Sequence, residues 1–175
     1  MKLLKNIGIV LVVIILVFVG VGFFLPSKYE VSRQIEINSD VKHVYQYVAD
    51  LKQWKNWGVW FQRDPAMKVF YSGSDMGVGS KSAWESETQG NGEMTIVNLV
   101  PGELVQYDLY FPDFDMRSVG TIRLQSKDKV TLVSWTDSGD VGNDIIGRYF
   151  VLFLDDMLGP DFEAGLSNLK ALVET

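Results

Sequence analysis

The first pattern along the chain is an uninterrupted apolar run over residues 7–25, without one charged or strongly polar side chain. An α-helix rises about 1.5 Å per residue, so this run is just long enough to cross a hydrocarbon core of roughly 30 Å. A cleaved secretory signal is the alternative, because Lys2 and Lys5 precede the run. Bulky Phe23 and Phe24 stand where a cleavage site needs small residues, so we favour an uncleaved signal anchor.

The charges on either side of the apolar run predict its direction through the membrane. Lys2, Lys5 and the amino terminus precede it, whereas the flank after it mixes basic with acidic residues. The positive-inside rule then places the N-terminus in the cytoplasm. We therefore expect a single-pass cell-membrane protein with residues 1–28 as anchor and short linker. Residues 29–175 form one domain of ordinary size, extracytoplasmic if the source is bacterial.

After the linker, hydrophobic and polar residues alternate over residues 29–37, which is typical of a strand with one face on a core. Asn38-Ser39 then predicts a helix N-cap. Val41, Val44 and Val48 recur at helical spacing up to about Asp50, and a second short helix is expected over residues 51–57.

Alternation returns after residue 67 in successive runs closed by glycine, proline or Asp/Ser clusters, which indicates an antiparallel meander. About six strands are predicted there. They cover residues 67–72, 79–87, 92–100, 104–111, 116–125 and 130–138. The joins are short enough for hairpin turns, so neighbours in sequence should be neighbours in the sheet.

The helical period returns after Gly142 and is expected to break at Gly159-Pro160, where the backbone loses a hydrogen-bond donor. A last helix then begins at Pro160. Its apolar stripe, Phe162, Leu166, Leu169 and Val173, needs a broad partner, and the concave side of the sheet is the one available. The predicted fold class is therefore α+β: a curved antiparallel sheet of about seven strands wrapped around a long C-terminal helix, with two short helices after the first strand.

Four stretches in this order resemble the START-like superfamily with its helix-grip fold (SRPBCC), in its polyketide cyclase/dehydrase-like branch. They are Ile35-Glu36-Ile37 with Asp50, Trp54 and Trp57; Gly77-Val78-Gly79 with Trp84, Gly90-Asn91-Gly92-Glu93-Met94, Ile96 and Pro101; Val133-Ser134-Trp135; and Gly159-Pro160-Asp161-Phe162 with residues 165–170 and Glu174. The resemblance covers residues 29–175 and implies a cavity between the sheet and the C-terminal helix that accepts apolar or amphipathic small molecules. It implies no single reaction, because members include lipid carriers, receptors and cyclases.

Composition excludes several function classes. The net charge of -6 and the lack of clustered basic residues argue against nucleic-acid binding. The chain has no cysteine, and its single histidine, His43, belongs to the polar side of a helix, so nucleophilic catalysis and a transition-metal site are poorly supported. Aspartates cluster at Asp113 and Asp115 and again after Asp137; solvated turns explain them better than a calcium site. We expect no metal and no cofactor.

Aromatic residues are numerous for a domain of this size, and alternation places several of them on one face of the sheet. If this face is concave, they line the cavity with a few polar groups. The expected ligand-binding residues are Trp54, Trp57, Trp60, Ser82, Trp84, Tyr107, Leu109, Phe111, Trp135, Asp137, Phe162 and Leu166. Large side chains that fill the space are the alternative. Trp57, Trp60 and Phe61 could also form an apolar rim facing lipid or ligand.

Asp137 is the candidate acid or base, because a carboxylate inside an apolar cavity has a raised pKa. Glu85 should point away from Trp84, to the surface. The favoured function is a membrane-anchored domain that binds a hydrophobic or amphipathic ligand, lipid or isoprenoid-like. The alternatives are a cyclase or dehydratase on an aromatic or polyketide-like substrate, using Asp137, Tyr107 or Ser82, and a protein-interaction module of the cell envelope whose partner the sequence does not identify.

Overall fold

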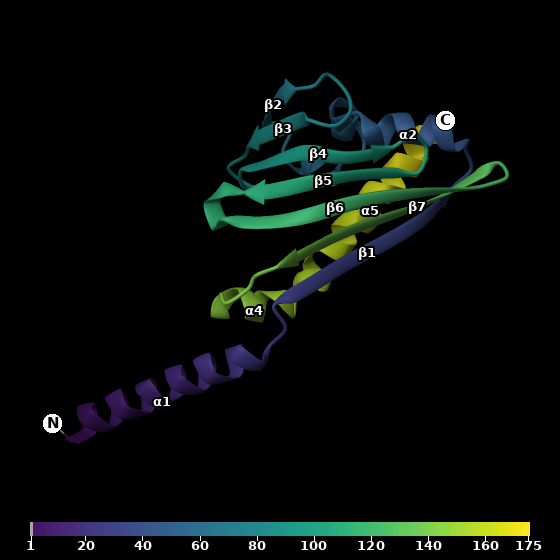
Figure 1. The fold of residues 1–175 in the computed structure, drawn as a ribbon. Coiled ribbons are helices and arrows are strands. Elements are labelled where there is room, and N and C mark those ends of the chain that lie inside the picture. Colours follow the sequence, from purple (N-terminus) through teal and green to yellow (C-terminus); the bar gives the residue numbers. More distant parts are fainter. Residues whose placement is uncertain (1) are drawn as a thin grey trace.

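The computed structural model describes residues 2–175, with side chains from residue 5 onward. It begins with α1 (Lys2–Phe24), a helix that extends away from the rest of the chain (Figure 1). Its apolar side chains are exposed along most of its length, and Lys5–Phe24 is long and apolar enough to cross a membrane. The amino terminus at Met1, which the positive-inside argument uses, lies outside the described residues.

The rest of the chain is built on one seven-stranded antiparallel sheet with the strand order β1-β7-β6-β5-β4-β3-β2. The strands are β1 (Lys28–Ile37), β2 (Lys68–Gly73), β3 (Ser80–Glu85), β4 (Gly92–Val100), β5 (Leu104–Phe111), β6 (Met116–Lys127) and β7 (Val130–Asp140). A short 3-10 turn, η2 (Pro112–Phe114), joins β5 to β6. The predicted meander is confirmed, and the predicted strand ends differ by at most two residues, where strands pass into turns.

Three short helices follow β1: α2 (Val41–Ala49), the 3-10 helix η1 (Leu51–Asn56) and α3 (Val59–Arg63). The predicted N-cap at Asn38-Ser39 is wrong. Asp40 caps α2 instead, because its backbone is extended and its carboxylate accepts a hydrogen bond of 2.8 Å from the Lys42 amide. Asp50 caps η1 in the same way, at 2.9 Å from the Lys52 amide.

Two helices close the chain, α4 (Ile145–Val151) and α5 (Leu154–Val173). The predicted break at Gly159-Pro160 is wrong, because α5 runs through Pro160 and the chain instead turns at Leu152 and Phe153. A proline inside a helix removes one backbone donor and is tolerated where packing holds the helix. The break therefore lies seven residues before the proline, between α4 and α5.

Arg33 of β1 provides this packing. A Cβ atom at Gly159 would overlap the Arg33 guanidinium, so the absence of a side chain there lets α5 approach the strand. The guanidinium forms ion pairs with Asp155 at 2.8 Å and Glu163 at 2.7 Å. Asp155 and Glu163 lie about one helical turn before and after Gly159. The two ion pairs of Arg33 therefore hold this part of α5 against β1.

The apolar stripe of α5 packs on one face of the sheet, and Figure 1 shows the yellow helix crossing that face diagonally. Phe162, Leu166, Leu169 and Val173 are all buried, as the helical spacing predicts. The sheet wraps around its last helix, so the helix-grip architecture and the α+β class are confirmed. This enclosed face is the one we call concave below.

Candidate functional site

A cluster of aromatic rings fills the space between the sheet and α5. Trp135 of β7 stacks on Phe162 of α5 with ring centroids 4.3 Å apart and an interplanar angle of 2°. Trp54 and Trp57 meet the Trp135 ring edge-on, at 5.6 and 5.3 Å. All four side chains are at most 4% exposed. Edge-on and offset-stacked rings are the favoured geometries for aromatic contacts, so this is a well-formed part of the core.

The polar edges of these rings are paired inside the protein. The Trp135 indole donates to the Tyr107 hydroxyl at 2.8 Å, Trp54 donates to the Val48 carbonyl at 3.0 Å, and Trp57 donates to the Tyr47 carbonyl at 3.1 Å. Buried indole N–H groups need such partners. This inner half of the expected cavity is therefore occupied by side chains, and the ligand-binding role of these residues stays a prediction.

The outer half of the concave face is less covered. Strand register places Leu109 opposite Met94, and Met94 opposite Ser82, so all three share a face with Tyr107. Leu109 and Met94 are partly exposed, and Ser82 is 5% exposed. Trp84 and Phe111, also partly exposed, meet edge-on at 6.1 Å. These residues form an apolar surface that α5 does not fully bury, and we call it the open end of the concave face.

A buried polar cluster lies on the same face near the ends of β1 and β7. The Asp137 carboxylate is 3% exposed and accepts hydrogen bonds from the Ser118 hydroxyl at 2.9 Å and the Tyr29 hydroxyl at 3.1 Å. Burial raises the pKa of Asp137 to about 6, although both hydrogen bonds oppose that shift. Burial also raises the pKa of the Tyr29 hydroxyl above its usual range. The prediction of a raised Asp137 pKa is confirmed.

The raised Asp137 pKa makes folding stability depend on pH. The folded state holds this proton more tightly than the unfolded state, so the free energy of unfolding should fall as the pH rises from about 4 to about 6 and then level off. A shift of this size corresponds to roughly 3 kcal/mol. Asp137→Asn should remove this fall, since the amide stays neutral, its oxygen can accept from one hydroxyl and its NH2 group can donate to the other. Urea unfolding of both proteins between pH 4 and pH 7 tests this; parallel profiles would contradict it.

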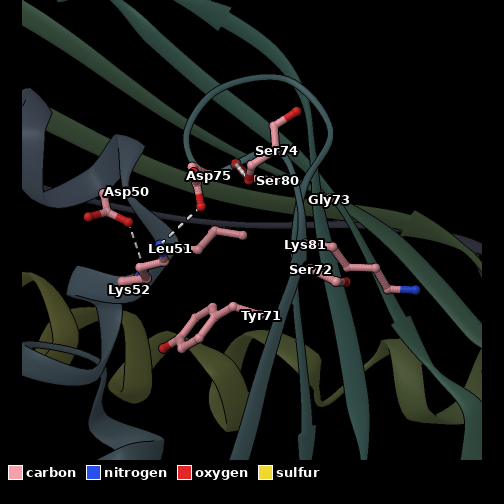
Figure 2. A pocket seen from close by; sticks show the side chains of 10 residues that line it. All are labelled: Asp50, Leu51, Lys52, Tyr71, Ser72, Gly73, Ser74, Asp75, Ser80 and Lys81. Atoms are coloured by element: carbon pink, nitrogen blue, oxygen red, sulfur yellow. Dashed lines mark hydrogen bonds and ion pairs between the residues drawn. The ribbon is translucent and has the colours of Figure 1, made fainter.

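Two hollows lie at the edges of the domain. The first, of about 200 Å³, separates the start of η1 from the β2–β3 hairpin; Figure 2 shows Lys52 reaching across it to Asp75 at 3.6 Å. Its lining is mostly polar, so it suits an apolar ligand poorly. The second lies along β1 and β7 and includes Tyr29 and Gly139. Tyr29, which lines this hollow, is also the residue that donates to Asp137.

The predicted apolar rim is only partly correct. Trp57 is fully buried and belongs to the aromatic cluster, because its indole turns inward to the Tyr47 carbonyl. Trp60 is partly exposed and donates to the buried Asp161 carboxylate at 3.1 Å. The same carboxylate pairs with Arg63, so Trp60 is held by a polar contact between α3 and α5. Phe61 is partly buried against the core.

The sequence-predicted residues thus separate into two groups. Trp54, Trp57, Tyr107, Trp135, Phe162 and Leu166 form the packed inner half, and Trp84, Leu109 and Phe111 lie on the open end. Ser82 lies on β3, four strands away from the strand β7 that carries Asp137, so it does not join the Asp137 cluster. Tyr29 and Ser118 were missed. Alternation in β1 puts Tyr29 on the face of Val31, but only the pairing of β1 with β7 brings it to Asp137.

The remaining polar residues singled out in the sequence lie at the surface or have local structural roles. His43 and Glu85 are exposed, as predicted. The aspartates after Asp137 have separate local roles, because Asp140 accepts from the Gly142 amide at 2.8 Å and Asp144 caps α4. Among side chains from residue 5 onward, no three potential metal ligands converge on one point.

The concave antiparallel sheet closed by α5 defines a helix-grip domain. The chain belongs to the family described as polyketide cyclase / dehydrase and lipid transport, whose profile matches residues 28–174. Among curated proteins, no sequence matches the chain.

Solved structures share the fold at low sequence identity. Protein CV1439 from Chromobacterium violaceum is similar with a TM-score of 0.61 and 20% identity, covering 83% of this chain and 97% of that one. Aha1 from Colwellia psychrerythraea, solved as a dimer, has a TM-score of 0.57 and 19% identity over 83% of this chain and 96% of its own. Protein jhp0584 from Helicobacter pylori has a TM-score of 0.62 and 10% identity over 82% and 87%. At these identities the likeness concerns the fold alone.

Proposed function

We propose that this protein is a membrane-anchored binder of a hydrophobic or amphipathic small molecule, lipid or isoprenoid-like. Residues 1–28 serve as anchor and linker in the cell membrane, with the N-terminus cytoplasmic, and residues 29–175 serve as the binding domain outside it. Only Leu25, Pro26 and Ser27 separate α1 from β1, so the domain lies within a few residues of the bilayer surface. An insoluble ligand is concentrated there.

The observation that carries this proposal is the open end of the concave face. Its partly exposed side chains, Trp84, Met94, Leu109 and Phe111, offer an apolar surface, and the Asp137 cluster lies on the same face toward β1. Burying a few hundred Å² of apolar ligand surface at about 25 cal/mol per Å² contributes several kcal/mol before ordering costs. An apolar chain on the open end with a polar group near Tyr29 matches an amphipathic ligand.

Photo-cross-linking of the full chain in nanodiscs tests this proposal. The discs contain a phospholipid with a photoactivatable group in one acyl chain, and labelled peptides are mapped by mass spectrometry. We expect labels on β3 and β5, which carry Trp84 and Leu109, besides labels on α1. Leu109→Glu should abolish the label on the domain and keep that on α1, because a charge on the open end excludes an acyl chain.

A matched control is Phe70→Glu. Tyr71 of β2 lies opposite Ser82 and so shares the concave face. Phe70 is the neighbouring residue and is exposed, so it belongs to the outer face of the sheet. This variant should keep both labels. Labels confined to α1 in the unaltered protein would contradict lipid binding by the domain and would favour a role in protein contacts.

The buried carboxyl favours a second candidate, a cyclase- or dehydratase-like enzyme. Asp137 titrates near neutrality, so it can exchange protons with a substrate that reaches the Tyr29 side of the cluster. Tyr107 is fully enclosed by the aromatic cluster, and burial raises the pKa of its hydroxyl, which suits it poorly to proton transfer. Asp137→Asn separates the candidates, since an enzyme loses turnover whereas a binder keeps its lipid label.

A further inference from the structure

A second apolar surface lies beside the anchor helix, and it is independent of the concave face. Five large side chains on α4, in the turn after it and at the start of α5 are each more than half exposed. They are Ile146, Phe150, Leu152, Phe153 and Met157. We call this set the α4 patch. Large apolar groups clustered on a surface mark sites that contact a partner or a membrane.

The α4 patch is continuous with the surface of α1. The Phe18 and Tyr149 rings stack with centroids 4.2 Å apart and an interplanar angle of 8°. A Cβ at Gly22 would come within 2.5 Å of Ile145, so α4 fits against the bare backbone of α1 at that point. Figure 1 shows α4 at the end of the domain from which α1 leaves.

Three hydrogen bonds place α4 relative to the depth of α1. The Tyr149 hydroxyl donates to the Phe18 carbonyl at 2.7 Å, and Phe18 lies six residues before the end of the helix at Phe24. At about 1.5 Å per residue, this contact lies about 9 Å below the end of α1. Arg148 donates to the Phe23 carbonyl at 2.9 Å and the Leu25 carbonyl at 3.1 Å.

The positions of these contacts along α1 agree with the depths of the hydrocarbon core and the interface of a bilayer. Lys5–Phe24 spans about 30 Å, the thickness of the hydrocarbon core, so Phe24 lies near the boundary of that core. Arg148 pairs with the last carbonyls of α1 at that boundary, where a long cationic side chain reaches the headgroups. Tyr149 then lies below it. Interfacial helices are buried about 5–10 Å in this region, which agrees with the position of α4.

We infer that the α4 patch inserts into the outer interface of the same bilayer that α1 spans, and so sets the orientation of the domain on the membrane. The inference rests on the proposed membrane anchoring. Asp155 and Asp156 lie between Phe153 and Met157 of the patch, so attraction to anionic lipid contributes little and apolar burial provides the contact. The inserted end is the end where β1 begins and β7 finishes, and it carries Tyr29 and Asp137.

The chain has no cysteine, so one introduced cysteine provides a single site for a thiol-reactive fluorophore. The full chain is reconstituted in phosphatidylcholine vesicles with one cysteine at a time, from Phe150→Cys, Phe153→Cys or Val13→Cys. Each carries an environment-sensitive fluorophore, and the vesicles contain lipids with a spin-label quencher at shallow or deep positions. Phe70→Cys is the matched control, because Phe70 is equally exposed but lies on β2, away from α1.

The probes at positions 150 and 153 should lose most of their fluorescence to the shallow quencher, and the probe at position 70 should lose little. The probe at Val13, in the middle of α1, should respond to the deep quencher. Quenching at position 13 without quenching at 150 and 153 would overturn the inference and leave the anchor intact. Lack of quenching at position 13 would instead overturn the anchor itself. A blue-shifted probe at 150 that no lipid quenches, together with disulfide-linked dimers of the unlabelled Phe150→Cys protein under an added oxidant, would assign the patch to a second copy and also overturn it.

Discussion

Trp135→Ala should lower the free energy of unfolding by about 3–5 kcal/mol, the range for deleting a large buried aromatic side chain. Trp135 is 1% exposed and is the centre of the aromatic cluster, because Phe162 stacks on it and three other tryptophans meet it edge-on. Its removal also takes away the N–H donor that pairs with the Tyr107 hydroxyl, which leaves that buried group without its partner. Urea unfolding of the full chain in mild detergent, followed by circular dichroism, measures the loss.

Trp84→Ala is the matched comparison for this change. Trp84 is partly exposed at the open end and meets Phe111 alone among the aromatic rings. Its replacement should therefore cost clearly less than the replacement of Trp135. Equal costs would mean that the inner cluster is packed no better than the open end.

Trp135→Ala also tests whether the inner half of the concave face is closed in the unaltered protein. Trp135→Ala leaves an apolar cavity between the sheet and α5, and such cavities bind small aromatic molecules. Indole should raise the urea midpoint of the variant and leave that of the unaltered protein unchanged, since a ligand that binds only the folded state stabilises it. An equal rise in both proteins would show that the unaltered protein already offers an open space there.

Gly120→Ala should destabilise the domain by about 1–3 kcal/mol through overpacking, the second large effect that we expect. Gly120 lies on β6 directly opposite Tyr107, and a Cβ there would overlap the Tyr107 ring. The ring is 2% exposed and its hydroxyl is held by the Trp135 indole, so it has no free direction in which to move. The strain should spread to the aromatic cluster.

A double-mutant cycle identifies this mechanism. In a Tyr107→Leu background the aromatic ring is absent, so Gly120→Ala should cost much less than in the unaltered protein. Urea midpoints of the four proteins provide the coupling energy. A cost of Gly120→Ala that stays the same in both backgrounds would show that the overlap with Tyr107 is not its cause.

Trp135 and Gly120 both belong to the closed half of the concave face. The rings around Trp135 close one half of the concave face, and Gly120 keeps the Tyr107 ring flat against the sheet as part of that closure. A ligand is therefore expected on the other half, between Trp84 and the Asp137 cluster. That half lies toward the end of the domain that carries α1 and the α4 patch, as the proposed function requires.

The sequence alone determined the elements whose signal is periodic. The apolar run of α1, the alternating runs of the meander and the stripe from Phe162 to Val173 each follow from the spacing of side chains along one segment. Alternation also put Trp135 and Asp137 on one face of their strand, and the structure shows that this face is the concave one. These properties are local, because each element must turn its apolar residues to one side wherever it packs.

Only the tertiary structure decided how separate segments meet. Pro160 continues α5 because Arg33, 127 residues earlier in the chain, holds the helix through Asp155 and Glu163. Tyr29 reaches Asp137 because β1 pairs with β7, and α4 adjoins α1 because Tyr149 stacks on Phe18. Likewise, whether Trp135 lines a cavity or fills it depends on rings supplied by three other elements. No pattern within one segment contains this information, because each contact joins residues that the chain holds far apart.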